Sequence, residues 1–178
     1  LANLHDRILF VGHLLQYHSA FQKLKSITVE RQLGNIQYIY SNRLNLGKFR
    51  QEESILWSFA PHDISMIISL IGDMPSEIFA TGANYLQREV SDVTTTHMKF
   101  PGGQHAHIFV SWLHPFKDQK MVIVGDNGMA VFDDTLDWPC KLTFYKQPVQ
   151  WEEGVPHPDP SDGISIPVEA AEPLKDEV

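Results

Sequence analysis

Residues 56–71 constrain the fold most strongly, because they join a polar start to an apolar helical repeat. Apolar residues fall at i, i+3, i+4 and i+7, namely Ile64, Ile67, Ile68 and Ile71. This spacing predicts a helix with one buried face. Ser58 is a suitable N-cap and Pro61 is tolerated in a first turn. Gly72 and Pro75 then end the helix.

His62 follows Ser58 by one helical turn, which predicts a position on the same side of the first turn. The field at a helix N-terminus disfavours a charged imidazole. A neutral imidazole in that place is a suitable proton acceptor. The alternative is a partly buried histidine with a structural role only, since perturbed groups are often structural.

Composition indicates a globular chain that does not bind nucleic acid. The 178 residues are 43% hydrophobic, which suits one domain with a sizeable core. The net charge of −8 is uneven, because residues 152–178 carry −7 and the rest carries −1. No basic stripe is available to neutralise phosphates along a duplex.

The single cysteine, Cys140, has no internal disulfide partner, and we expect a reducing cytoplasm. No apolar run reaches transmembrane length and no signal peptide is visible, so we expect no membrane partner. The chain begins with Leu1 rather than Met, which suggests a processed or truncated product.

The rest of the chain alternates like strands, apart from one further helix over 19–31 with a Ser19–Gln22 capping box. Strands are predicted by the patterns at 7–11, 35–45, 77–85, 90–100, 104–113, 121–124, 129–132 and 141–145. The Asp126-Asn127-Gly128 turn is a strong hairpin signal. We therefore predict an α+β fold, an open and mostly antiparallel sheet with helices on one face.

Residues 46–53 form a polar loop directly before the long helix, a candidate rim for a site or a plain surface loop. From residue 152 the chain is rich in Pro, Asp, Glu and Gly, and we expect an extended, weakly ordered tail. His97, His105 and His107 suggest a metal site, but no carboxylate accompanies them at ligand spacing. Cross-strand pairing explains these histidines better, and we expect no metal. The sequence also contains no phosphate-binding glycine loop and no nucleophile elbow.

Six pieces of the chain form an ordered set, namely residues 11–18 (VGHLLQYH), 33–36 (LGNI), 43–47 (RLNLG), 57–65 (WSFAPHDIS), 109–113 (FVSWL) and 124–133 (VGDNGMAVFD). Taken together and in this order, they resemble the Gfo/Idh/MocA oxidoreductase family. The resemblance implies the C-terminal substrate-binding and oligomerisation domain over residues 13–151. Residues 1–12 would be the last Rossmann strand and a connector, and residues 152–178 an acidic, Pro-rich tail.

In this family the N-terminal Rossmann domain binds NAD or NADP, so the resemblance implies a cofactor in the complete enzyme and none in this chain. The family's Glu-Lys-Pro segment is also absent from these residues. His62 matches the family's catalytic histidine in an Asp-x-x-x-His motif. Ser58 replaces the aspartate and cannot supply its charge.

The resemblance also implies substrate-binding residues, namely Arg43, Asn45, Lys48, Arg50, Trp57, Ser58 and Tyr17. Two functions follow from the sequence. One is the substrate-binding half of an NAD(P)-dependent sugar or nucleotide-sugar dehydrogenase, inactive by itself and homo-oligomeric through the open sheet face. The alternative is a stand-alone binding or assembly module without chemistry.

Overall fold

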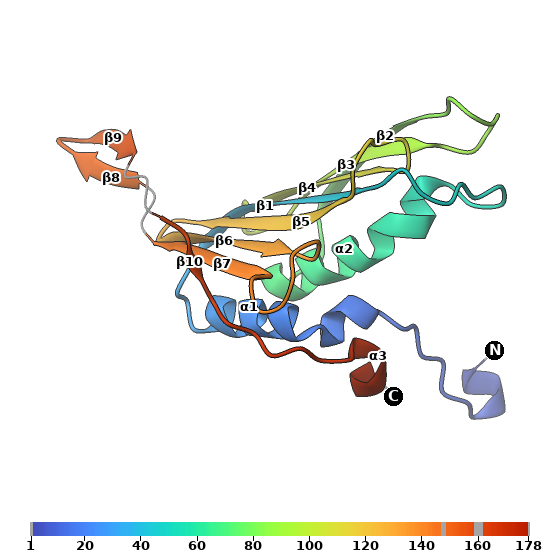
Figure 1. Cartoon of the computed structure of the whole chain (residues 1–178), viewed down its shortest axis with the longest axis horizontal. Helices are drawn as coiled ribbons and strands as arrows, with labels where there is room; N and C mark the ends of the chain where they lie inside the picture. The colour runs from blue at the N-terminus through green and yellow to red at the C-terminus, as the bar shows by residue number, and fades with distance from the viewer. Residues whose placement is uncertain (1, 147–148, 159–161, 178) are drawn as a thin grey trace.

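The computed structural model describes residues 2–146, 149–158 and 162–177. Eight strands form one open sheet in the order β10-β7-β6-β5-β1-β4-β3-β2 (Figure 1). They are β1 (Ile36–Leu44), β2 (Glu77–Ala83), β3 (Val93–Lys99), β4 (His105–Ser111), β5 (Asp118–Gly125), β6 (Gly128–Asp133), β7 (Leu142–Lys146) and β10 (Ile164–Ser165). Neighbouring strands are antiparallel except β1 and β4, which are parallel.

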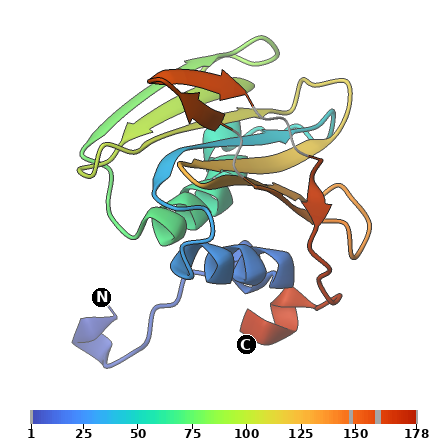
Figure 2. The same ribbon diagram turned by 90° about the vertical axis from the view of Figure 1, so that its left-hand side faces the viewer.

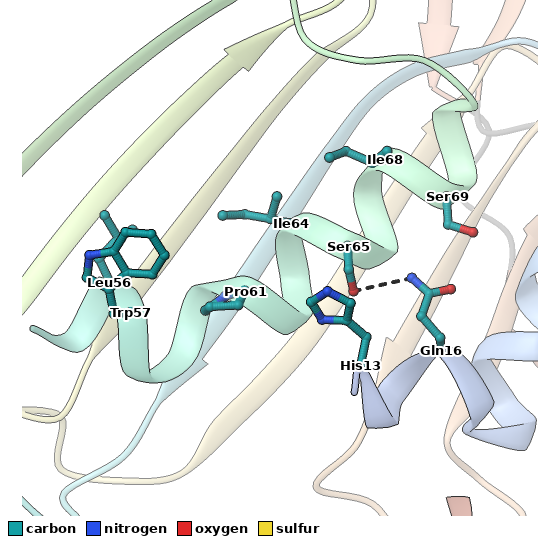
Figure 3. A pocket seen from close by; sticks show the side chains of 9 residues that line it. All are labelled: His13, Gln16, Leu56, Trp57, Pro61, Ile64, Ser65, Ile68 and Ser69. Carbon is teal, nitrogen blue, oxygen red and sulfur yellow. Dashed lines mark hydrogen bonds between the residues drawn. The ribbon is translucent and has the colours of Figure 1, made fainter. Parts of the chain in front are cut away.

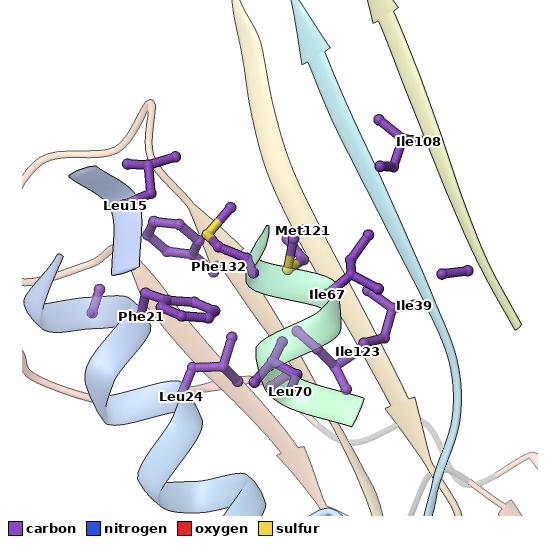
Figure 4. Close-up of a cluster of buried hydrophobic side chains, with 14 of the residues drawn as sticks. Leu15, Phe21, Leu24, Ile39, Ile67, Leu70, Ile108, Met121, Ile123 and Phe132 are labelled. Carbon is purple, nitrogen blue, oxygen red and sulfur yellow. The ribbon is translucent and has the colours of Figure 1, made fainter. Parts of the chain in front are cut away.

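Helices α1 (Ser19–Val29) and α2 (Ile55–Ile71) lie on one side of this sheet (Figure 2). Short turns of helix η1 (Asn3–His5), η2 (Leu14–Tyr17) and α3 (Pro173–Glu177) complete the helical elements of the described chain. The core fills the space between α1, α2 and the strands, with Phe21 and Leu24 facing Ile67 and Leu70 (Figure 4). The predicted fold class is therefore confirmed.

Helix α2 begins earlier than the sequence pattern predicts. Ser54 occupies the N-cap position, so Ser58 is the fourth helical residue and Pro61 lies inside the helix. The added turn buries Ile55 completely, and the Ile55 N–H donates to the carbonyl of Ser91 at 2.9 Å. The predictions of a Ser58 cap and a first-turn Pro61 are wrong for this reason, whereas Gly72 ends the helix in a left-handed conformation as predicted.

The predicted Ser19–Gln22 capping box is also wrong. His18 Nδ1 accepts a hydrogen bond from the Ala20 N–H at 3.2 Å and caps α1. Ser19 Oγ instead donates to the carbonyl of Glu169, 2.8 Å away. The helix ends at Val29, two residues before the predicted end.

Seven of the eight predicted strand patterns, all except residues 7–11, form strands, β1 to β7. On β1, Ile39 and Ser41 are buried against the helices while Tyr38 and Tyr40 lie on the other face. Strands β5 and β6 pair across the predicted turn, with Val124 opposite Met129. A Cβ on Gly125 would collide with the carbonyl of Leu33, which explains the glycine at this close approach.

The two ends of the chain differ from the predictions. Residues 7–11 form no strand, and Ile8 is 97% exposed because no described strand lies beside it. The tail is more ordered than predicted. Strands β8 (Val149–Glu152) and β9 (Val155–Pro158) form a separate hairpin, β10 pairs with β7, and Val168 reaches the core.

Candidate functional site

An apolar pocket of about 610 Å³ lies between η2 and the outer side of α2 (Figure 3). It is lined by His13, Gln16, Leu56, Trp57, Pro61, Ile64, Ser65, Ile68 and Ser69. Gln16 Nε2 donates to Ser65 Oγ at 3.2 Å and so ties η2 to the helix. The pocket combines apolar walls with a few polar groups, which is the usual character of a small-molecule site.

His62 is the eighth residue of α2, one turn after Ser58. It therefore lies beyond the first turn, and the predicted influence of the helix N-terminus does not apply to it. Its imidazole meets that of His13 edge to face, with ring centroids 6.4 Å apart. Ser65 Oγ donates to the His62 carbonyl at 2.8 Å, so the pocket's polar groups and the predicted catalytic residue share one turn of helix.

Arg43 faces inward and makes an ion pair beneath α2. Its Nε lies 2.7 Å and its Nη2 3.2 Å from the two carboxylate oxygens of Asp63. The Arg43 side chain is 11% exposed and that of Asp63 is 1% exposed. Ser41 Oγ donates to the same carboxylate at 2.6 Å. The pair fastens β1 to α2, and a further contact from Arg43 to substrate stays a prediction.

The loop before α2 carries the other two predicted cations. Residues 48–53 line a second, more polar hollow of about 630 Å³. Lys48 and Arg50 are exposed, and Arg50 Nε lies 3.2 Å from Glu53 Oε1. An exposed pair of this kind contributes little to stability, so Arg50 is free to exchange its partner for a ligand anion.

The remaining predicted site residues are Trp57, Ser58, Asn45 and Tyr17, and the first two lie in the first turn of α2. Trp57 is 73% exposed and lines the apolar pocket. Ser58 and Asn45 are half-buried, and the Asn45 N–H donates to the Ser111 carbonyl at 3.0 Å. Tyr17 is half-buried at the end of η2. The structure thus brings Trp57, Ser58, Lys48 and Arg50 to the start of α2, and their roles toward a ligand stay predictions.

Sequence reasoning missed three participants, His13, Gln16 and Asp63. The signal for Asp63 was present, because the alternation of β1 turns Arg43 toward the core. A buried guanidinium requires an acidic partner. No comparable signal marks His13 or Gln16, whose place in the pocket depends on how η2 packs against α2.

The three histidines considered as metal ligands lie on the open face of the sheet. His97 and His107 are direct cross-strand partners with ring centroids 5.7 Å apart, as the pairing prediction requires. Among the described residues, no three His, Cys, Asp or Glu side chains gather as a metal site. Over the same part of the chain, no helix has the length and apolar character needed to cross a membrane.

Solved structures show the same fold at low sequence identity. UDP-N-acetylglucosamine 3-dehydrogenase GnnA from Acidithiobacillus ferrooxidans superposes with a TM-score of 0.77 and 20% identity, over 99% of this chain and 52% of GnnA. The WlbA dehydrogenase from Chromobacterium violaceum, solved with NADH and UDP-GlcNAcA, gives a TM-score of 0.65 and 22% identity, over 74% of this chain and 42% of WlbA. An oxidoreductase from Pseudomonas syringae gives a TM-score of 0.71 and 15% identity, over 82% of this chain and 41% of the oxidoreductase.

Nearly the whole of this chain matches GnnA, but the chain spans only about half of the length of GnnA. A search of curated protein sequences found no match. The sequence profile of the GFO/IDH/MocA C-terminal domain matches residues 21–131, from α1 through most of β6. Because this match covers more than half of the chain, the protein belongs to the GFO/IDH/MocA family through its C-terminal domain.

Proposed function

We propose that this chain is the substrate-binding and oligomerising half of an NAD(P)-dependent dehydrogenase that acts on a nucleotide sugar. The observation that carries the proposal is the position of α2. This helix lies within the family match and brings Trp57 and Ser65 to a ligand-sized pocket, with Ser65 one turn after His62. The proposal concerns the complete enzyme, of which these residues would be one part.

The substrate class is supported by the relatives that share the fold. GnnA is named for UDP-N-acetylglucosamine, and WlbA was solved with UDP-GlcNAcA and NADH. In this chain, Lys48 and Arg50 would face the diphosphate, and Arg is well suited to phosphate oxygens. The exposed ring of Trp57 would provide an apolar wall.

His62 would hold the proton removed from the reacting sugar hydroxyl. Nicotinamide chemistry would supply the hydride acceptor. The sequence contains no G-x-G-x-x-G turn, so its residues do not fit the cofactor and we assign cofactor binding to the rest of the enzyme. We expect the 178 residues alone to give no heat of NADH binding in calorimetry, and a micromolar dissociation constant would contradict that.

The open face of the sheet is the proposed contact between copies. Exposed or half-buried apolar side chains lie on it, including Tyr38, Tyr40, Phe79, Phe109, Val122, Val124, Met129 and Val131. Eight strands of about seven residues cover roughly 34 by 23 Å, or about 800 Å² per copy. That area matches what each partner buries in a stable interface.

The test uses a gene product that extends beyond these residues. Its dehydrogenase activity is measured with UDP-N-acetylglucosamine and NAD⁺ or NADP⁺, from the absorbance of the reduced cofactor. His62→Ala should lower kcat by about 10²–10⁴-fold, the usual contribution of one positioned acid–base group. His157→Ala, which changes an exposed histidine in the separate β8–β9 hairpin, is the control. Activity of His62→Ala within about threefold of wild type would contradict the catalytic role. A longer product with no turnover and no glycine-rich turn would favour the stand-alone binding module.

A further inference from the structure

Asp92, directly before β3, is 1% exposed. Its carboxylate accepts three described hydrogen bonds. Its Oδ1 accepts from Trp112 Nε1 at 2.6 Å. Its Oδ2 accepts from the backbone N–H groups of Tyr85 and Leu86 at 2.6 and 2.8 Å. Burial raises the pKa of Asp92, but these three hydrogen bonds outweigh it and lower the pKa below 3.8. The carboxylate is therefore ionised near neutral pH and fixed in position.

The backbone around Asp92 joins three elements. The Asp92 N–H donates to the Ala83 carbonyl at the end of β2, 2.9 Å away. The Trp112 N–H, directly after β4, donates to the Asp92 carbonyl at 3.3 Å. The preceding residue, Ser91, accepts the N–H of Ile55, the first residue of α2. The start of α2 is thus registered against the Asp92 segment.

The loop that carries the predicted cations reaches the same centre. The Phe49 ring meets the fully buried Trp112 ring edge to face, with centroids 6.2 Å apart. Trp112 therefore contacts residues 46–53 through its ring and Asp92 through its Nε1. Residues 46–53 and the loop of residues 84–91 between β2 and β3 both project beyond the end of the sheet where α2 begins (Figure 1).

We infer that Asp92 is a positioning residue for the proposed substrate site, and that loop 84–91, which it holds, forms a second wall of that site. This inference rests on the proposed function. The wall presents Tyr85 and Leu86, which are 72% and 50% exposed although their backbone is fixed. An exposed aromatic ring on a fixed backbone contacts a nucleotide at little cost in conformational entropy.

The physical effect of Asp92 is to order both loops before the ligand arrives. Without the carboxylate, residues 84–91 would lose two hydrogen bonds, the Trp112 indole would lose a third, and the loop would be ordered only on binding. Ordering a loop during binding lowers affinity by roughly tenfold for each 1.4 kcal/mol it costs. Neither the family motif residues nor the pocket on α2 includes this segment.

The test is an NMR titration of the 178-residue chain with UDP-N-acetylglucosamine. In the wild type, amide shifts should change in residues 84–91 as well as in 46–57. Asp92→Asn keeps the shape but replaces one acceptor oxygen by a donor, and Trp112→Phe removes the indole donor together with one ring of the side chain. Both should raise the dissociation constant about tenfold. Asp73→Asn, at the far end of α2, should leave it unchanged.

Loss of stability alone must not produce the same result. Ile27→Val, on the buried face of α1, should lower the melting temperature without touching either loop, and the variant should bind like the wild type. If Asp92→Asn does not fold, Trp112→Phe decides the question. Wild-type affinity in Trp112→Phe, or a titration that leaves residues 84–91 unshifted, would overturn the inference. If the longer product turns over substrate but residues 84–91 show no amide shifts, the inference about Asp92 is wrong and the proposed function stands. If residues 84–91 shift but the longer product has no turnover, the proposed dehydrogenase function is wrong.

Discussion

The two faces of the sheet follow different rules, although adjacent residues of the same strands build them. On β1, Ile39 is fully buried beneath the helices, whereas its neighbour Tyr38 is 37% exposed on the open face. On the covered face, Arg43 and Ser41 are paired with Asp63 inside the fold. On the open face, the rings of Tyr38 and Tyr40 stack with that of His107.

This difference shows which face is complete within the described chain. The covered face is filled by α1 and α2, so a change there should act on folding. The open face carries apolar groups with no layer above them in the described residues, so a change there should act on association. Pairs of variants on the two faces test this division directly.

The largest effect is expected from Arg43→Ala. The variant leaves the Asp63 carboxylate buried with only Ser41 as a hydrogen-bond donor among its described side-chain partners. Breaking a buried pair from one side costs about 3–5 kcal/mol of the free energy of unfolding. Urea denaturation measures this, with Asn42→Ala on the opposite face as the control. A loss below about 1 kcal/mol would show that the pair contributes no more than a surface pair.

A smaller effect is expected from Ile123→Ala on β5. Ile123 is fully buried in the core, and truncation of such a side chain costs about 2–5 kcal/mol through lost transfer energy and a cavity. Val124→Ala, its neighbour on the open face, should cost less than about 1 kcal/mol when unfolding is measured at low protein concentration. Equal losses would mean that the open face is as well packed as the core.

Association between copies of the chain should depend on the open face and not on the covered face. Val122 lies near the centre of the open face, between Tyr40 on β1 and Val131 on β6. Val122→Glu should weaken dimerisation at least about hundredfold, because two like charges would meet across the contact. Sedimentation velocity measures the effect. A wild-type chain that stays monomeric at high micromolar concentration would remove the basis for this prediction.

The sequence was sufficient for those parts of the fold where one local signal dominates. Alternation assigned Tyr38 and Ile39 to opposite faces, and the Asn127-Gly128 pair located the β5–β6 hairpin. The start of α2 was misjudged because Ser58 is a good cap by composition. The contact that decides the start, between Ile55 and Ser91, is formed by tertiary structure.

The residues of the candidate site also divide into those that a local motif reveals and those that only tertiary structure brings together. Trp57 and His62 could be selected from their motif, since both belong to one helix. Asp92 and Trp112 are 20 residues apart and belong to different strand ends, so no local pattern reveals that one carboxylate holds two loops. The strand order that places β1 between β5 and β4 was equally hidden, because it joins segments far apart in the sequence.

The smallest predicted effect concerns pH and the ring stack of the open face. Burial lowers the pKa of His107 below 6.5, and the neighbouring His97 lowers it further. The unfolded chain therefore binds this proton more readily than the folded chain does. Stability should consequently fall as the pH drops through 6.5 toward the lowered pKa.

Urea denaturation of the wild type and of His107→Gln across this pH range measures the effect. His107→Gln should reduce the pH dependence while leaving the fold intact, because the side chain is only half-buried among Tyr38, Tyr40 and His97. His105→Gln, exposed on the same strand, is the matched control. If the two variants changed the slope equally, the stacked position of His107 would have no special effect. If copies associate through this face, the slope attributed to His107 should increase with protein concentration, because association would bury the imidazole further.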